Sequence, residues 1–258
     1  MLQSVVIGID RYRDPGIRDL ACCRRDAMAV RDLLCNVHPS DRRVEVLLDE
    51  EATRERIMVS LGEDLPRRCE VGDLVVVYFA GHGSPEIDSA PDEVARYLIA
   101  HDTDARNVYA TSIDMEHDIV RLLHRLARPR LVLVLLDACF SGRAGGRTFE
   151  GPRLRRWRAD ERASGPIRLA DLDLGDGRLL ISACGDDEVA REEPALGHGV
   201  FTTYLLRGPA RTGADGATVT VTSLYDHLAH EVRQHTSGRQ TPTLNGRAVL
   251  AQLPNLWR

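Results

Sequence analysis

The chain has 258 residues, of which 43% are hydrophobic and 28% are charged, and its formal net charge at pH 7 is −5. This composition excludes a disordered chain, and the length suffices for one large α/β domain or two small ones with a substantial core. There is no apolar run of the ~20 residues that span a bilayer, no signal-peptide pattern, and no basic charge that would indicate nucleic acid. We therefore expect a cytoplasmic protein with no nucleic acid and no membrane among its partners.

Short apolar runs alternate with amphipathic segments along the whole chain, which is typical of βαβ units on a parallel sheet. We predict strands at residues 3–9, 43–48, 73–80, 131–137 and 178–184, with a sixth near 247–252. Helices are predicted over residues 24–35, 116–127, 198–207 and 222–235, the last one capped by Thr222 or Ser223. The pattern predicts an α/β fold with a mainly parallel sheet and helices on both faces.

The connection between the fourth and fifth predicted strands, residues 143–176, is rich in glycine and arginine and has no apolar periodicity. From Arg143 to Arg168 there are eight arginines and three acidic residues, so this acidic protein carries a local charge of +5 here. Loops this long inside a compact domain are usually functional or disordered. We therefore expect a function for this connection.

Two of the predicted strands end in a polar residue at a glycine-rich turn. The run 74–80 is followed by Gly81-His82-Gly83, and the run 131–136 is followed by Asp137-Ala138-Cys139. Ligand sites of open α/β sheets lie at the carboxyl ends of such strands. A thiol with a pKa near ~8.5 needs a base to act as a nucleophile, and a histidine at the same edge supplies one. The sequence thus predicts catalytic His82 and Cys139 in a cysteine peptidase, although a lone histidine is more often structural and the glycines alone could make a tight turn.

These two segments resemble those of the caspase-like (clan CD) peptidases, and most of all the metacaspases and bacterial caspase-like proteins. Further matches follow in the family's order at residues 5–10, 20–27, 181–184, 197–202 and 240–244. The resemblance implies a caspase-like three-layer sandwich of about six strands. It also implies one peptidase domain over residues 1–258, with a large-subunit-like half (1–142), an Arg-rich linker (143–176) and a small-subunit-like half (177–258).

The same resemblance implies roles for four residues around the nucleophile. In the family, the backbone N–H groups that correspond to Gly83 and Cys139 form the oxyanion hole, and the acids that correspond to Asp26 and Asp137 line the pocket for the residue before the scissile bond. An acidic pocket calls for a cation, and the planar arginine fork suits carboxylates. We therefore expect an endopeptidase that cleaves after arginine or lysine through a thioester. For Asp26, a charge at a helix start is the alternative.

No cofactor or metal is predicted with certainty. Metacaspases often bind calcium, and five acids (Asp88, Asp92, Glu93, Asp102 and Asp104) follow the histidine, but they lack EF-hand spacing, so we favour a solvated acidic loop over a Ca2+ site. The cysteines other than Cys139 show no C-x-x-C spacing, so we expect core thiols rather than a zinc site. Asp186, Asp187 and Glu188 are weaker candidates for holding substrate.

The partners expected from the resemblance are a protein or peptide substrate and, by analogy with bacterial defence systems, a sensor or partner protein. Caspase-like enzymes commonly cut themselves between their halves, and arginines at 143, 147, 153, 155, 156, 158, 162 and 168 offer bonds that suit an acidic pocket. We expect a mobile, self-processed linker, against an intact basic loop or one that docks a partner. A catalytically silent interaction or scaffold module is the alternative for the whole chain; a nucleotide-binding domain is disfavoured because both glycine-rich phosphate-loop motifs are missing.

Overall fold

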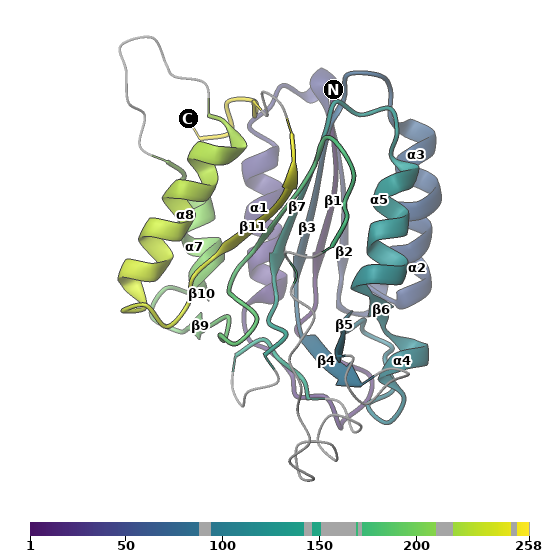
Figure 1. The fold of residues 1–258 in the computed structure, drawn as a ribbon, viewed down its shortest axis with the longest axis vertical. Coiled ribbons are helices and arrows are strands. Elements are labelled where there is room, and N and C mark those ends of the chain that lie inside the picture. Colours follow the sequence, from purple (N-terminus) through teal and green to yellow (C-terminus); the bar gives the residue numbers. More distant parts are fainter. Residues whose placement is uncertain are drawn as a thin grey trace.

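A six-stranded sheet in the order β11-β8-β7-β3-β1-β2 runs through the centre of the computed structural model (Figure 1). The structure describes residues 1–87, 94–141, 146–150, 169, 172–209, 219–248 and 252–257. The strands are β1 (Leu2–Gly8), β2 (Arg42–Leu48), β3 (Leu74–Ala80), β7 (Leu131–Asp137), β8 (Arg178–Ser182) and β11 (Thr243–Arg247). All neighbours are parallel except β11 and β8. The predicted fold class, mainly parallel α/β, is confirmed.

The position of the sixth strand was predicted wrongly. It was expected near residues 247–252, where the apolar residues are, but β11 covers Thr243–Arg247 and carries a polar sequence. An antiparallel edge strand does not need the continuous apolar run that marks a central parallel strand. Gly246 has φ +106°, and a Cβ there would lie 2.1 Å from the carbonyl oxygen of Arg178, so the strand's close approach to β8 requires this glycine.

Helices cover both faces of the sheet and make two separate apolar cores (Figure 1). One face packs against α2 (Arg54–Val59), η3 (Ser60–Asp64), α3 (Leu65–Arg68), η4 (Met115–Val120) and α5 (Arg121–Arg125). The other face packs against α1 (Cys23–Leu34), α7 (Val200–Arg207) and α8 (Val221–His235). Successive side chains of β3 alternate between the two cores, so this strand is buried on both sides, as its apolar run predicts.

The helices differ from the prediction in detail. The helical segment from Arg54 to Arg68 was not predicted, and the expected helix 116–127 is η4, a π-helix, continued by α5. Thr220 caps α8, and its side chain and that of Ser223 form a reciprocal capping box, so the cap lies two residues before the expected Thr222. None of the helices in the described part of the chain has both the length and the apolar character needed to cross a bilayer.

Two small sheets and several short helical turns lie outside the central sheet. One small sheet has β4 (Gly83–Ile87), β5 (Val94–Leu98) and β6 (Ile113–Asp114), and the other has β9 (Glu192–Glu193) and β10 (His198–Gly199). The turns are η1 (Pro39–Asp41), η2 (Asp49–Glu51) and α4 (Val108–Thr111). In Figure 1, β4, β5, β9 and β10 lie towards the lower end of the central sheet, where β1, β3 and β7 end.

The contact between β1 and α1 leaves no room for a side chain at Gly8. A Cβ at this position would lie 2.5 Å from the carbonyl oxygen of Cys23 and 2.6 Å from the Cβ of Ala27. The last residue of β1 therefore touches the backbone of α1 one turn from Asp26. This close approach sets how near Asp26 lies to the carboxyl edge of the sheet.

We expect Gly8→Ala to lower the free energy of unfolding by about 1–3 kcal/mol, because the added methyl group overpacks the β1–α1 contact. Urea denaturation measures the change. Gly185→Ala is the matched control, since its Cβ would meet nothing closer than 3.7 Å and Gly185 has no positive φ. Equal stability of the two variants would contradict this account of the contact.

Candidate active site

His82 and Cys139 emerge at the same edge of the central sheet. Strands β3 and β7 pair in parallel with Ala80 opposite Asp137, and each of the two side chains comes two residues after its strand end. Both side chains are buried. No hydrogen bond between the imidazole and the Sγ atom occurs in the described structure.

The imidazole of His82 has a defined tautomer. Its Nε2 lies 2.7 Å from the carbonyl oxygen of Arg18, and a carbonyl can only accept, so Nε2 carries the proton. Nδ1 is left with a lone pair and, among the described residues, without a hydrogen-bond partner. The Tyr12 hydroxyl accepts from the backbone N–H of His82, and the two rings lie 5.1 Å apart. Burial lowers the pKa of His82 to about 4, so a neutral base is available at Nδ1.

Cys139 differs electrostatically from the other buried cysteines. A hydrogen bond from the Cys184 side chain, and others from the side chain and backbone of Ser141, lower the pKa of Cys139 to about 6 against the effect of burial. In the opposite direction, the Cys139 thiol donates to the carbonyl oxygen of Glu188 at 2.7 Å, which favours the protonated form, and its Sγ lies 3.1 Å from the Ser141 hydroxyl. Burial instead raises the pKa of Cys69 to about 11 and that of Cys23 well above its usual range. The pKa of Cys139 is therefore shifted downward, whereas those of Cys69 and Cys23 are shifted upward.

Two backbone amides converge on one carbonyl oxygen beside this thiol. The N–H groups of Gly83 and Cys139 both donate to the oxygen of Arg147, at 3.0 Å each. Paired donors of this kind are suited to an oxyanion. A Cβ at Gly83 would lie 2.5 Å from the carbonyl oxygen of Cys139 and 2.9 Å from the Phe140 ring, so a side chain at position 83 would disrupt the arrangement.

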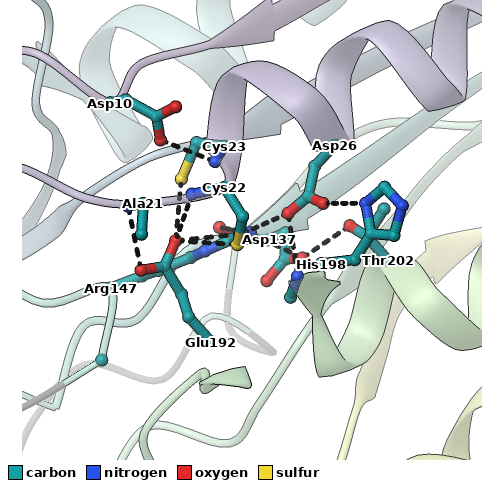
Figure 2. Close-up of polar contacts among 12 residues, drawn as sticks. Asp10, Ala21, Cys22, Cys23, Asp26, Asp137, Arg147, Glu192, His198 and Thr202 are labelled. Atoms are coloured by element: carbon teal, nitrogen blue, oxygen red, sulfur yellow. Dashed lines mark hydrogen bonds and ion pairs between the residues drawn. The ribbon is translucent and has the colours of Figure 1, made fainter. Parts of the chain in front are cut away.

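Asp26 and Asp137 lie together in a pocket that is already filled. Asp26 comes from the first turn of α1 and Asp137 from the last residue of β7, and both carboxylates are fully buried. The guanidinium of Arg147 lies between them: Nη1 is 2.6 Å from Asp137 Oδ2, and Nη2 pairs with Asp26 Oδ2 (Figure 2). Glu192 lies 3.5 Å from Nη2. Burial raises the pKa of Asp137, while Arg147 and Thr202 act in the opposite direction.

Arg147 belongs to the predicted Arg-rich linker, but its side chain is not exposed to solvent. Arg147 and Phe149 are buried, and Gly146, Thr148 and Glu150 are partly buried. The other seven linker arginines, at 143, 153, 155, 156, 158, 162 and 168, lie outside the described residues. The burial of Arg147 was not predicted from the sequence, because the segment around it is rich in arginine and has no apolar periodicity.

Further residues of the pocket were not assigned from the sequence (Figure 2). His198 Nδ1 lies 2.6 Å from Asp26 Oδ1, the Gly199 N–H donates to Asp26 Oδ2, and the Thr202 hydroxyl donates to Asp137 Oδ2. All three lie within the segment 197–202, which was singled out as a family match without a role. A Cβ at Gly199 would lie 2.7 Å from both Arg147 Nη2 and Asp137 Oδ2, so glycine is required where α7 meets the pocket.

The acids considered for other roles have protein partners where the structure describes them. Asp102 accepts from the Arg54 N–H and Asp104 from the Arg106 N–H, whereas Asp88, Asp92 and Glu93 lie outside the described residues. Asp186 forms an ion pair with Arg96, and the side chain of Glu188 accepts the backbone N–H groups of Gly185 and Thr241.

One cluster of Asp10, Cys23 and Glu192 has the spacing of metal ligands, with the three ligand atoms within 4.8 Å of one another. Both carboxylates accept backbone N–H groups at the start of α1: Asp10 from Cys23 and Arg24, and Glu192 from Ala21 and Cys22. The cluster thus satisfies the free amides of a helix N-terminus.

Comparisons with known proteins agree with this architecture. The family described as Caspase domain matches residues 3–253. A crystal structure of protein GSU0716 from Geobacter sulfurreducens superposes with a TM-score of 0.72, at 20% sequence identity, over 99% of this chain and 98% of that chain. At this identity the likeness concerns the fold. No curated protein sequence matches the chain.

We expect the Cys139 thiol to titrate with a midpoint near pH 6, so that the thiolate fraction rises with pH through that value. The ultraviolet absorbance of the thiolate, taken as the difference between wild type and Cys139→Ser, measures this titration. A midpoint at or above the ~8.5 of a free thiol would contradict the assignment of Cys184 and Ser141 as donors to the sulfur.

Proposed function

The chain belongs to the Caspase domain family, and on this premise we propose that it is a cysteine endopeptidase that cleaves after arginine, and more slowly after lysine. The observation that carries the proposal is that both the side chain and the backbone carbonyl of Arg147 are bound at this site. Its guanidinium lies between Asp26 and Asp137 while its carbonyl oxygen accepts the amides of Gly83 and Cys139. A substrate arginine held in this way presents its carbonyl carbon beside the thiol.

The proposed reaction follows from the groups at this edge. Cys139 Sγ attacks the carbonyl carbon, and the oxyanion that forms is stabilised by the N–H groups of Gly83 and Cys139. His82 Nδ1 relays a proton to the leaving amine as the C–N bond breaks, with Arg18 O holding the ring in the required tautomer. Water then hydrolyses the thioester, which releases the new carboxylate and restores the thiol.

The preference for arginine over lysine rests on the shape of the pocket. Asp26 and Asp137 each take a different nitrogen of one planar fork. A lysine ammonium is a single charged centre and offers no such fork. An aspartyl side chain would place a fourth negative charge beside Asp26, Asp137 and Glu192, so the pocket repels the substrates that acid-specific enzymes accept.

We expect wild type to hydrolyse a fluorogenic peptide ending in arginine, and Cys139→Ala and His82→Ala each to remove essentially all of this turnover. Circular dichroism checks that both variants remain folded. Because Arg147 occupies the pocket, Arg147→Ala is assayed in parallel as a form with the pocket open. If neither wild type nor Arg147→Ala cleaves the peptide, the chain is a silent scaffold; a preference for aspartyl peptides would refute the proposed specificity.

The pocket acids have their own test. Asp137→Asn should lower kcat/KM for arginyl peptides by about tenfold or more, because one charge-assisted hydrogen bond to the guanidinium is weakened. The arginine-to-lysine ratio of kcat/KM should fall in the same variant. Asp32→Asn is the matched control, since Asp32 lies on the same helix as Asp26 with an exposed side chain. An unchanged ratio in Asp137→Asn would remove Asp137 from the specificity pocket.

A further inference from the structure

We propose that the Arg147–Thr148 bond is the protein's own first substrate, cleaved in cis by Cys139, and that residues 146–149 block the site until this bond is cut. The proposal rests on the peptidase function proposed above and goes beyond it, because it names one bond and one intramolecular occupant. Most of the linker arginines are outside the described residues, so the inference stands on the contacts of residues 146–149 alone.

The backbone N–H, the carbonyl oxygen and both Nη atoms of Arg147 are bound in the manner of the residue that precedes a scissile bond. Its backbone N–H donates to the carbonyl oxygen of Ala190 at 3.1 Å. Its carbonyl oxygen accepts the amides of Gly83 and Cys139, and its guanidinium lies between the two buried carboxylates. A structural ion pair would need only the guanidinium. The carbonyl contacts are what place the peptide group at the nucleophile.

The residues on both sides of this bond are held as well. On the amino side, Arg18 Nη2 donates to the carbonyl oxygen of Gly146 at 2.7 Å. On the other side, the Phe149 N–H donates to the carbonyl oxygen of Gly83 at 2.8 Å, and Thr148 pairs with Gly83 in a parallel bridge. The segment therefore crosses the site on either side of the bond, as a bound peptide does in β-strand addition.

The segment is also adapted to this position. Gly146 has φ +60°, and a Cβ there would lie 2.3 Å from both the carbonyl oxygen of Ala190 and Cγ1 of Val189. Only glycine tolerates this conformation and this approach without strain. The residue before Arg147 thus lets the chain enter the pocket, and the ring of Phe149 is buried on the far side of the bond.

The proposed step is complete with the atoms present and water. Cys139 Sγ bonds to the carbonyl carbon of Arg147, and the bond from that carbon to Thr148 N breaks. The proton lost by the thiol passes through His82 Nδ1 to Thr148 N, which leaves as a free amine. Water then replaces sulfur at the carbonyl carbon. The products are a chain that ends in the Arg147 carboxylate and a chain that begins with Thr148.

Cleavage changes access to the pocket without separating the two parts. An intramolecular arginine has a high effective concentration and excludes substrates from other molecules while the bond is intact. After cleavage, Arg147 is a chain end and can leave. Strand β7 belongs to one product and β8 to the other, and they remain neighbours in one sheet with Leu133 opposite Leu179. The cut protein therefore stays one folded particle.

Mass spectrometry with amino-terminal sequencing tests the bond. Purified wild type should yield two products, 1–147 and 148–258, that co-elute in size-exclusion chromatography, while Cys139→Ala stays whole. Arg147→Lys should slow the cut at least about tenfold, and Arg147→Ala should abolish it at this position, whereas the linker control Arg153→Ala should leave it unchanged. A cut elsewhere that persists in Arg147→Ala, with position 147 intact, would overturn the proposal.

Two further measurements test whether cleavage is intramolecular and whether residues 146–149 block the site. They are the dependence of self-cleavage on protein concentration and the activity of variants on an arginyl peptide. The rate constant for self-cleavage should be independent of protein concentration, and wild type should not cut tagged Cys139→Ala. Thr148→Pro, which keeps Arg147 but replaces the leaving amine, should be uncut and at least about tenfold less active on an arginyl peptide than Arg147→Ala. Uncut wild type with full peptide activity would overturn this inference and leave the proposed function standing; no activity in any variant would remove the proposed function itself.

Discussion

Two carboxylates without access to water are the constraint on which the arrangement of the site depends. Asp26 and Asp137 are fully buried and face the same space, and the free-energy cost of burying such charges is offset only by a cation and hydrogen bonds. Arg147, Thr202 and the Gly199 N–H supply these from two other segments of the chain. In this structure the guanidinium of Arg147 therefore completes the pocket.

The parallel register of β3 and β7 determines the rest of the chemistry. Because Ala80 lies opposite Asp137, the segments that carry His82 and Cys139 leave the sheet together, and the amides of Gly83 and Cys139 converge on one oxygen. A shift of one residue would turn every side chain of the strand to the other face. The continuous burial of both strands holds this register, so core packing positions the side chains to which we assign the reaction.

The central sheet also explains why the protein can stay folded after a peptide bond in the linker between β7 and β8 is cleaved. Strands β7 and β8 are separated by the long linker in sequence and are adjacent in space, so the sheet does not depend on the linker for its order. Arg147, at the start of that linker, is held by contacts from both sides: Asp26 and Asp137 before it in the chain, and Ala190 and Glu192 after it. The linker thus reaches into the site from the boundary of the two halves.

The sequence by itself determined the central strands, the fold class, and the presence of a histidine and a cysteine at neighbouring strand ends. Each of these follows from local patterns, because a strand buried on both faces must be continuously apolar. Polar side chains that could take part in a reaction therefore come directly after the apolar run ends. The roles of Gly83, Asp26 and Asp137 came from a family resemblance and stay predictions. The polar edge strand β11 and the small sheets were missed because edge strands need no such apolar run.

Only the tertiary structure decided where Arg147 lies and which groups surround it. Its charge and its arginine-rich neighbourhood are those of a solvated loop, and no periodicity marks it as buried. Its carboxylate partners are separated from it by up to 121 residues along the chain, so their attraction takes effect only after the sheet has brought its carboxyl edge, α1 and β9 together. Burial of an apolar strand is encoded locally, whereas the choice of an ion-pair partner depends on distances that only the completed fold defines.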